Sequence, residues 1–545
     1  MRLLGQQDAL AAVGDVWCTE YVTESTTAIP VRGGHVLGID FESSEAITSQ
    51  FADVISEVTI LHDNLAQVED VATEITLVRA CADVCKVAYL LRAKGNEIEV
   101  PALEKYDKLL QSSLERLLGE PIGGPAVMQA SLGVKEGGLG FRRAQDLALP
   151  AFISSRLEAR WLIEKFVLNE AFSKLPVCGM INSYDATTDE PINRFEQSLP
   201  EGARLKMQSV IDDFRTTAIE DRRSHAPRLS ALAGDGLVVP AGAEDNEAEG
   251  ECNLQSKLCS IADEYRADYL DSLLHVAGDW NGKRRLRELR DSTTSHTWLW
   301  SLNPCHGPIV PPTHFLTAVR LRLGAPSIES MMVCPRCGRE DLDRPCAHAL
   351  CCSIPEATRG HNKVRDVVLQ LAHLADPSAS SEPLNLIPSA PMLRPADVLT
   401  STAFPGCLAA LDIGVSSPDS SGAGDDCCES MRARKCNDYA DYLVELQDNG
   451  VRYQPLTFSA YGRMHLETES ALLSLSLRVV RRRGLRDHRP ILKRACSVIG
   501  VQIWKRAASM VLACLPSLEI EEERLFFGCE ASRRYVSMRA FCTGI

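Results

Sequence analysis

The chain has 545 residues, of which 45% are hydrophobic, and a formal net charge of −15. This length predicts several domains with their own cores, and no apolar run is long enough to span a bilayer, so we do not expect a membrane protein. The first residues turn polar too early for a secretory signal, and 20 cysteines in so long a chain are not typical of a disulfide scaffold. We therefore expect a protein of a reducing, intracellular compartment.

The N-terminal part reads as helical. Residues 1–36 show no clear pattern, whereas residues 37–230 carry helical periodicity, with one helix expected to begin near Pro150 and to end near Phe166. A glycine-rich loop over residues 131–143 should lead into that helix. The acidic stretch 231–255 is predicted to be a flexible linker.

A second helical region, residues 256–330, is expected to connect this linker to the C-terminal part. Its Trp280, Trp298 and Trp300 are predicted to pack in a core. The run from His314 to Leu323 has the pattern of an amphipathic helix, with Arg320 and Arg322 expected on its solvent face.

Residues 331–360 have the spacing of a small zinc knuckle. Cys334 and Cys337 form a CxxC pair, which lets one turn offer two thiolates to a tetrahedral ion. The second pair of zinc ligands must follow within reach along the chain, and we favour His348 and Cys352. Four protein ligands would make this zinc ion structural rather than catalytic.

The sequence leaves the second half of the zinc site open. Cys351 or Cys346 could replace Cys352, because the spacing does not fix which sulfur faces inward. His361 could likewise replace His348.

Two acidic residues lie in the strands predicted next. Asp397 ends one short run, and Asp412 interrupts the apolar run of residues 407–415 after a turn, so the two runs are expected to pair as a hairpin. A carboxylate in a buried strand is costly unless a cation or a donor compensates it. If the two carboxylates lie side by side, they can share a catalytic Mg²⁺. Asp425 and Asp426, in the acidic loop that follows, could compete for this ion.

The following segment, Met431 to Asn449, is predicted to be one helix and supplies the basic residue that such a site needs. Lys435 and Tyr439 are four residues apart, on one helix face, and Arg434 lies beside them. We expect Lys435 to orient the attacking water or to stabilise developing charge, and Arg434 and Tyr439 to contact nucleic acid.

The end of the chain is locally basic despite the acidic total. Residues 431–513 contain 15 Lys and Arg against 7 Asp and Glu. They include Arg481, Arg482 and Arg483, which we expect to contact phosphates beside the carboxylate site. A strand over Arg452–Phe458 and helices over Leu466–Arg482 and Pro490–Ala513 complete the predicted elements, and residues 516–545 form a tail.

At these motifs the chain resembles the C-terminal part of the polyproteins of non-long-terminal-repeat retrotransposons. The family's Arg-Pro-Asp corresponds to Arg394-Pro395-Ala396-Asp397, its acidic second strand to residues 411–415, and its Arg-Lys-x-x-Lys-Tyr to residues 434–439, with Asp438 in place of the second lysine. Its Arg-His-Asn appears as Arg359-Gly360-His361-Asn362. Residues 131–143 resemble the segment that follows the palm of these elements' reverse transcriptases, and the polymerase motif itself is absent.

This resemblance implies a mainly α N-terminal region, a zinc knuckle at residues 331–360, and a C-terminal α/β domain of restriction-endonuclease-like (PD-(D/E)xK) fold at residues 361–515. It also implies a Mg²⁺-dependent DNA endonuclease whose nick supplies a 3′-hydroxyl primer. Element RNA and a separate reverse transcriptase would be further partners, and a nuclear location follows only from the DNA substrate. The alternative is a non-catalytic remnant that keeps the zinc knuckle and binds nucleic acid.

Overall fold

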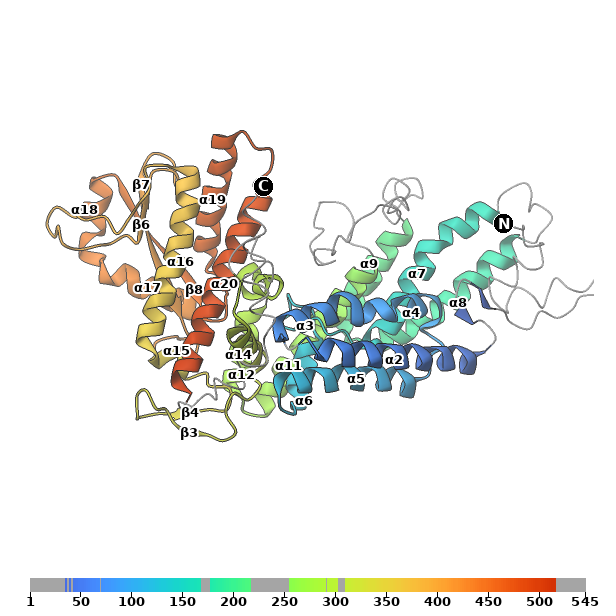
Figure 1. The fold of residues 1–545 in the computed structure, drawn as a ribbon. Helices are drawn as coiled ribbons and strands as arrows, with labels where there is room; N and C mark the ends of the chain where they lie inside the picture. The colour runs from blue at the N-terminus through green and yellow to red at the C-terminus, as the bar shows by residue number, and fades with distance from the viewer. Residues whose placement is uncertain are drawn as a thin grey trace, which may run out of the picture.

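The computed structural model describes residues 35–36, 39–40, 43–68, 70–167, 177–216, 254–290, 292–301 and 309–515. Most of residues 1–36, residues 231–253 of the expected linker and the tail 516–545 lie outside the described residues. The described part is mostly helical and forms two lobes, an N-terminal helical lobe and a C-terminal lobe that contains a four-stranded sheet (Figure 1). No helix in these ranges is long and apolar enough to cross a membrane.

Long helices build the N-terminal lobe around shared apolar cores. The first, α2 (Ser44–Ala66), begins where the Ser43 hydroxyl accepts a hydrogen bond from the Ala46 amide. It packs with α4 (Ala88–Lys94), α5 (Val100–Leu118) and α7 (Ala144–Val167). The other elements of this lobe are β1 (His35–Val36), β2 (Ile39–Asp40), α3 (Val71–Leu77), η2 (Val78–Ala82), η3 (Val84–Lys86), α6 (Gly124–Ser131), α8 (Val177–Gln197), α9 (Glu201–Thr216) and α11 (Leu254–Val276).

The helix expected to begin near Pro150 begins six residues earlier. In the structure α7 starts at Ala144, whose amide donates to the Asp107 carboxylate on α5 at 2.6 Å, and Pro150 lies inside the helix. The cap of α7 therefore comes from another helix, so the residues next to the start of α7 do not show where it begins.

A buried arginine joins the glycine-rich loop to the middle of the molecule. Arg322 on α14 (Pro312–Leu323) is fully buried, and its guanidinium donates to the carbonyls of Gly138, Val134 and Ser295 at 3.1, 2.9 and 2.7 Å. The prediction that Arg322 faces solvent is therefore wrong, because α14 is packed on several sides. Arg320 also bonds inward, to the Leu118 carbonyl at 3.1 Å through its Nε.

Tryptophans pack between the lobes, although not all of the predicted ones. Trp298, in η6 (Thr297–Trp300), is fully buried and stacks on Trp504 of α20 (Arg489–Cys514), with ring centroids 4.8 Å apart. Trp300 is covered by the Arg79 guanidinium, 3.5 Å from the ring centroid. Trp280 is 53% exposed, so its predicted place in a core is wrong. It opens α12 (Trp280–Leu289), which leads to α13 (Thr293–His296).

The C-terminal lobe begins with a small hairpin, β3 (Met332–Val333) and β4 (Asp341–Leu342), followed by α15 (Ala349–Cys352) and α16 (Ile354–Ala375). Its sheet has the order β5-β6-β7-β8, formed by Ser380–Ser381, Val398–Thr400, Leu408–Ser416 and Val451–Ser459. The pairing of β6 with β7 is antiparallel and that of β7 with β8 is parallel. The predicted hairpin between the two acidic runs is thus present.

Helices cover both faces of this sheet. Leu411 and Ile413 of β7 share a core with α16, α19 (Leu466–Arg483) and α20. The intervening residues of β7 face the other side, toward α17 (Cys427–Asp438), because successive side chains of a strand alternate between faces. The C-terminal lobe thus contains a small mixed sheet packed between helices, and the restriction-like fold expected from the sequence stays a prediction.

The segment predicted as one helix over Met431–Asn449 is interrupted. α17 begins earlier, at Cys427, where the Asp426 carboxylate accepts the amides of Cys428 and Glu429 at 2.8 and 3.0 Å. It ends at Asp438, and the short η8 (Ala440–Tyr442) and α18 (Leu443–Asp448) follow. Both predicted helices near the C-terminus are present as α19 and α20.

Candidate metal centre and carboxylate site

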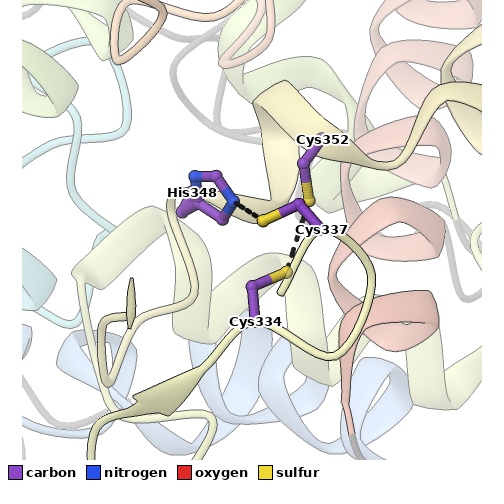
Figure 2. Close-up of side chains that lie close together, drawn as sticks. All are labelled: Cys334, Cys337, His348 and Cys352. Carbon is purple, nitrogen blue, oxygen red and sulfur yellow. Dashed lines mark hydrogen bonds between the residues drawn. The ribbon is translucent and has the colours of Figure 1, made fainter. Parts of the chain in front are cut away.

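Four side chains of the predicted zinc knuckle converge on one point. The ligand atoms of Cys334, Cys337, His348 and Cys352 all lie within 4.8 Å of one another. Figure 2 shows them facing a common centre, with the Cys334 and Cys352 sulfurs 3.5 Å apart and the Cys337 sulfur 3.4 Å from His348 Nε2. Three thiols and one imidazole in such an arrangement are a ligand set of structural zinc sites.

Local backbone geometry presents these ligands. The Cys334 amide bonds to the Glu340 carbonyl at 2.8 Å, and the Gly338 amide bonds back to the Cys334 carbonyl at 2.8 Å. Gly338 has φ +62°, a left-handed conformation that glycine adopts without strain, so the turn can close after Cys337. The Glu340 carboxylate lies 2.9 Å from His348 Nδ1, which leaves Nε2 to face the thiols, as for many metal-bound histidines.

The residues left open as substitutes point elsewhere. Burial raises the pKa of Cys346 to about 12, and its thiol faces the Arg344 carbonyl at 3.8 Å. Cys351 lies outside the four-ligand group, and His361 contacts Asp397 through Nε2 at 3.3 Å. Among the described residues, the geometry therefore selects the set that the sequence favoured.

The thiols differ in how readily they ionise. At Cys334 burial raises the pKa, but hydrogen bonds from the amides of Cys337 and Arg336 outweigh it, so the pKa is lowered. Amides of Arg339 and Glu340 lower the pKa of Cys337. Burial and the neighbouring Cys334 thiol raise the pKa of Cys352, which fits a sulfur that ionises only with a cation beside it.

One thiol beside the cluster was missed by the sequence reasoning. The sulfur of Cys514, near the end of α20, lies 3.7 Å from that of Cys352. Burial raises its pKa to about 11. Its distance along the chain gave no spacing signal, and it packs the knuckle against α20.

A second pair of groups meets on the sheet. Asp412 lies in the middle of β7, and its Oδ1 accepts from Lys435 Nζ of α17 at 2.6 Å. The Tyr453 hydroxyl of β8 donates to the other carboxylate oxygen at 2.5 Å. The helix lysine expected near the carboxylates thus lies on Asp412 itself, while Tyr453 was not identified from the sequence.

Asp397 was expected to end the first strand, but it lies one residue before β6 begins, beside β7. Its Oδ2 accepts the Ile413 amide at 2.7 Å, and Oδ1 is 3.3 Å from His361 Nε2 of α16. The carboxylate is thereby fixed next to the residue that follows Asp412. The Tyr439 hydroxyl donates to the Arg394 carbonyl at 3.0 Å and its ring packs on Tyr453, so Tyr439 borders the pair.

The two carboxylates have opposite pKa shifts. Burial raises the pKa of Asp412 and outweighs the lowering effect of Lys435 and Tyr453, while the nearby charge of Asp397 raises it further. At Asp397 burial acts in the same direction, but His361 and the Ile413 amide outweigh it, so the pKa is lowered. In the described ranges no third Asp, Glu, His or Cys gathers with this pair as tightly as the zinc ligands do.

The other residues predicted to bind nucleic acid lie at different distances from this pair. Arg434 is exposed on α17, next to Lys435. Arg481, Arg482 and Arg483 are exposed at the end of α19, where Arg482 donates to the carbonyls of His373 and Leu374 at 3.2 and 3.0 Å.

These arginines therefore lie away from the carboxylates. Arg482 meets α16 at its C-terminal end, whereas Asp397 meets the same helix at His361, about 18 Å earlier along the axis at 1.5 Å per residue. They can contact a nucleic acid only at phosphates well removed from the pair.

The acidic loop between β7 and α17 is anchored by contacts of its own. Asp426 caps α17 and pairs with Arg463 at 2.6 Å. Burial raises the pKa of Asp426, but Arg463 and two helix amides lower it to about 2. Asp426 is therefore already paired with Arg463 and with the start of α17, and its possible competition for the metal of the site stays a prediction.

A second group of potential ligands lies near this loop. Ligand atoms of Glu288, Cys427 and Cys428 lie within 4.8 Å of one another, and all three residues are buried. Both Glu288 oxygens already accept from Arg463, at 2.7 and 3.2 Å, so we interpret this group as a buried ion pair beside two thiols.

No protein-family model matches the sequence, and no curated protein matches it.

Proposed function

We propose that this protein is a retroelement-derived, Mg²⁺-dependent endonuclease that nicks DNA and is stabilised by a structural zinc ion. The observation that carries the proposal is the meeting of Asp397, just before β6, with Asp412 of the inner strand β7 and Lys435 of α17. An acidic pair next to a half-buried lysine is a charge pattern suited to metal-assisted phosphodiester cleavage.

The donor set fits Mg²⁺, which prefers carboxylate oxygens and keeps several waters. When bound between Asp397 and Asp412, the ion would polarise the scissile phosphate and lower the pKa of a coordinated water. Asp412 must be ionised for this role, and Lys435 and Tyr453 favour its ionised form against burial.

Lys435 has two partners in this scheme. Its ammonium now lies on Asp412 at 2.6 Å. Once the carboxylate faces a cation, we expect the ammonium to turn toward the attacking water or the phosphate oxygens, where it stabilises developing charge. His361 holds Asp397 in position from α16. The 3′-hydroxyl left at the nick would serve as the primer for a reverse transcriptase on another polypeptide.

The test is nicking of supercoiled plasmid by the full chain, loaded with zinc, with and without Mg²⁺. Asp397→Asn, Asp412→Asn and Lys435→Met should each abolish Mg²⁺-dependent nicking, by at least about 100-fold for a group that acts in the chemical step. Asp438→Asn is the matched control, since Asp438 is an exposed acid near the end of the same helix. Nicking that survives Asp412→Asn, or that the control loses equally, would refute the assignment.

One observation favours the second candidate, a zinc-dependent nucleic-acid-binding protein without cleavage. Both oxygens of Asp412 are already occupied, by Lys435 and Tyr453. A permanently closed ion pair of this kind would stabilise the sheet and leave no room for Mg²⁺. This candidate predicts bound zinc and DNA binding but no nicking by folded protein.

A further inference from the structure

A groove lies where the two lobes meet, away from both sites described above. It has a volume of about 750 Å³ and is bounded by α11 and α12 on one side and by the loop before α17 on the other. Figure 1 shows α12 at the junction of the lobes, beside α11 and α14. The groove thus joins the helical connector to the lobe that carries the carboxylate pair.

One face of α12 supplies the aromatic ring and three of the basic side chains that line this groove. Trp280, Arg284 and Arg287 are spaced at i, i+4 and i+7, and Lys283 lies between them, so all four side chains fall on the same face of the helix. Leu286, which also lines the groove, and Leu289 are buried behind this face. The Trp280 side chain is therefore exposed at the surface rather than packed in a core.

The aromatic ring is held in a defined position while it remains accessible. Trp280 is 53% exposed, and its ring meets the His275 ring in a T-shaped contact, with centroids 4.9 Å apart and planes at 85°. With about half of its surface exposed, the residue can still accept a stacking partner. An exposed tryptophan beside several cations is unusual for a surface without a ligand, because tryptophan normally buries most of its area.

The basic face of α12 favours an anionic partner. Five basic side chains line the groove against three acidic ones, Asp268, Asp271 and Asp425, but Arg290 and Arg463 are held in ion pairs, with Glu136 and Asp268 and with Glu288 and Asp426. Arg284 lies 3.4 Å from Asp419, so the charge open to a ligand is mainly that of the α12 face. The Arg287 side chain is 51% exposed and meets the loop through the Asp425 main-chain carbonyl, not through its carboxylate. Lys283 pairs with Asp271 at 3.1 Å, in a solvated contact that is worth little and is easily exchanged.

We propose that this groove binds a single strand of nucleic acid, with one base stacked on Trp280 and phosphates held by Lys283, Arg284 and Arg287. A basic groove with an exposed aromatic ring is how proteins bind single strands without sequence preference. The loop that closes the groove continues into α17, and Lys435 lies about 12 Å further along that helix. A strand in the groove can therefore lead toward the carboxylate pair.

The test measures binding of a fluorescent 20-nucleotide thymidine strand to the full, zinc-loaded chain by anisotropy. The Asp412→Ala background without added Mg²⁺ is used, so that cleavage has no influence and a failure of the nuclease assignment does not affect the result. Trp280→Ala should weaken binding about 5- to 150-fold, the range for loss of one base–aromatic stack, and Trp280→Tyr should restore most of it. Arg287→Glu should weaken binding and reduce the slope of log affinity against log salt concentration by about 0.7, the value for one phosphate of a single strand.

Lys257→Glu on α11 is the matched charge control, because Lys257 is exposed and does not line the groove. It should leave the dissociation constant within about twofold. Equal losses for Lys257→Glu and Arg287→Glu, an unchanged constant for Trp280→Ala, or binding of duplex in preference to single strands would each overturn the proposal. Repeating the titration with the corresponding uridine strand distinguishes DNA from RNA as the source of the strand.

Discussion

Gly414 allows α17 to approach β7 closely enough for Lys435 to reach Asp412. A Cβ at this position would lie 2.8 Å from the Lys435 Cε and 2.8 Å from the Met431 Cγ. Both atoms belong to flexible side chains, so Gly414→Ala should displace the ammonium at a stability cost of about 1–3 kcal/mol. We expect plasmid nicking to fall about 10-fold or more, while the melting temperature drops by only a few degrees. Gly422→Ala is the control, since nothing lies within 4 Å of a Cβ there, and equal effects of both changes would contradict this interpretation.

The adjacent cysteines 351 and 352 offer a matched pair for testing the zinc ligands. Cys352 belongs to the four-ligand group and Cys351 does not. Zinc content measured by mass spectrometry on purified protein should be one ion per chain in the wild type and in Cys351→Ser. It should fall well below one in Cys352→Ser, because removing one ligand opens a structural site. Retention of a full ion by Cys352→Ser would exclude it as a ligand.

Among the elements, α14 depends on Arg322 for its connection to the glycine-rich loop. Three carbonyls share this one guanidinium, and desolvation in its fully buried position lowers its pKa to about 9. Arg322→Leu would leave three buried acceptors unsatisfied, which we expect to destabilise the protein by about 3–5 kcal/mol. Thermal unfolding should show this as a large fall in melting temperature. Arg486→Leu, a change at an exposed arginine, should have little effect.

The helical lobe also contains a carboxylate that makes its stability depend on pH. Asp83 is fully buried near the Arg142 amide and the Tyr106 hydroxyl, and burial raises its pKa from 3.8 to about 7. A raised native pKa gives stability that is complete below about pH 4 and is lost as the pH rises through 7. The loss amounts to at most about 4 kcal/mol, at 1.36 kcal/mol per pKa unit.

The change Asp83→Asn should remove this pH dependence. Between pH 5 and pH 8 the melting temperature of the wild type should therefore fall more than that of the variant. Asp63→Asn, at an exposed position near the end of α2, should behave like the wild type. Parallel pH curves for the wild type and Asp83→Asn would contradict the assignment.

Across the whole molecule, local patterns predicted elements better than they predicted contacts between distant segments. The β6–β7 hairpin, β8, α19 and α20 follow from periodicity and turn residues, and the CxxC spacing identified the metal-ligand group. Long-range partners were not readable: the cap of α7 comes from Asp107, the carbonyls that bury Arg322 come from distant loops, and Tyr453 reaches Asp412 from another strand. Trp280 was wrongly assigned to a core, because the sequence does not show which side of α12 the lobes cover.

The lobes are joined by polar contacts as well as by the stacked tryptophans. Arg463, beyond β8, pairs with Glu288 on α12 and with Asp426 at the start of α17. The connector, the groove and the helix that carries Lys435 are thus linked through one side chain.

The most direct measurement of the central claim is binding of Mn²⁺, as a paramagnetic substitute for Mg²⁺, to zinc-loaded protein by electron paramagnetic resonance. Two carboxylates that share one ion should bind one Mn²⁺ per chain, since Mn²⁺ accepts the same oxygen ligands. The account predicts that Asp397→Asn and Asp412→Asn each abolish this binding, whereas Asp438→Asn retains it. Manganese binding that is absent from the wild type, or that persists in Asp412→Asn, would contradict it.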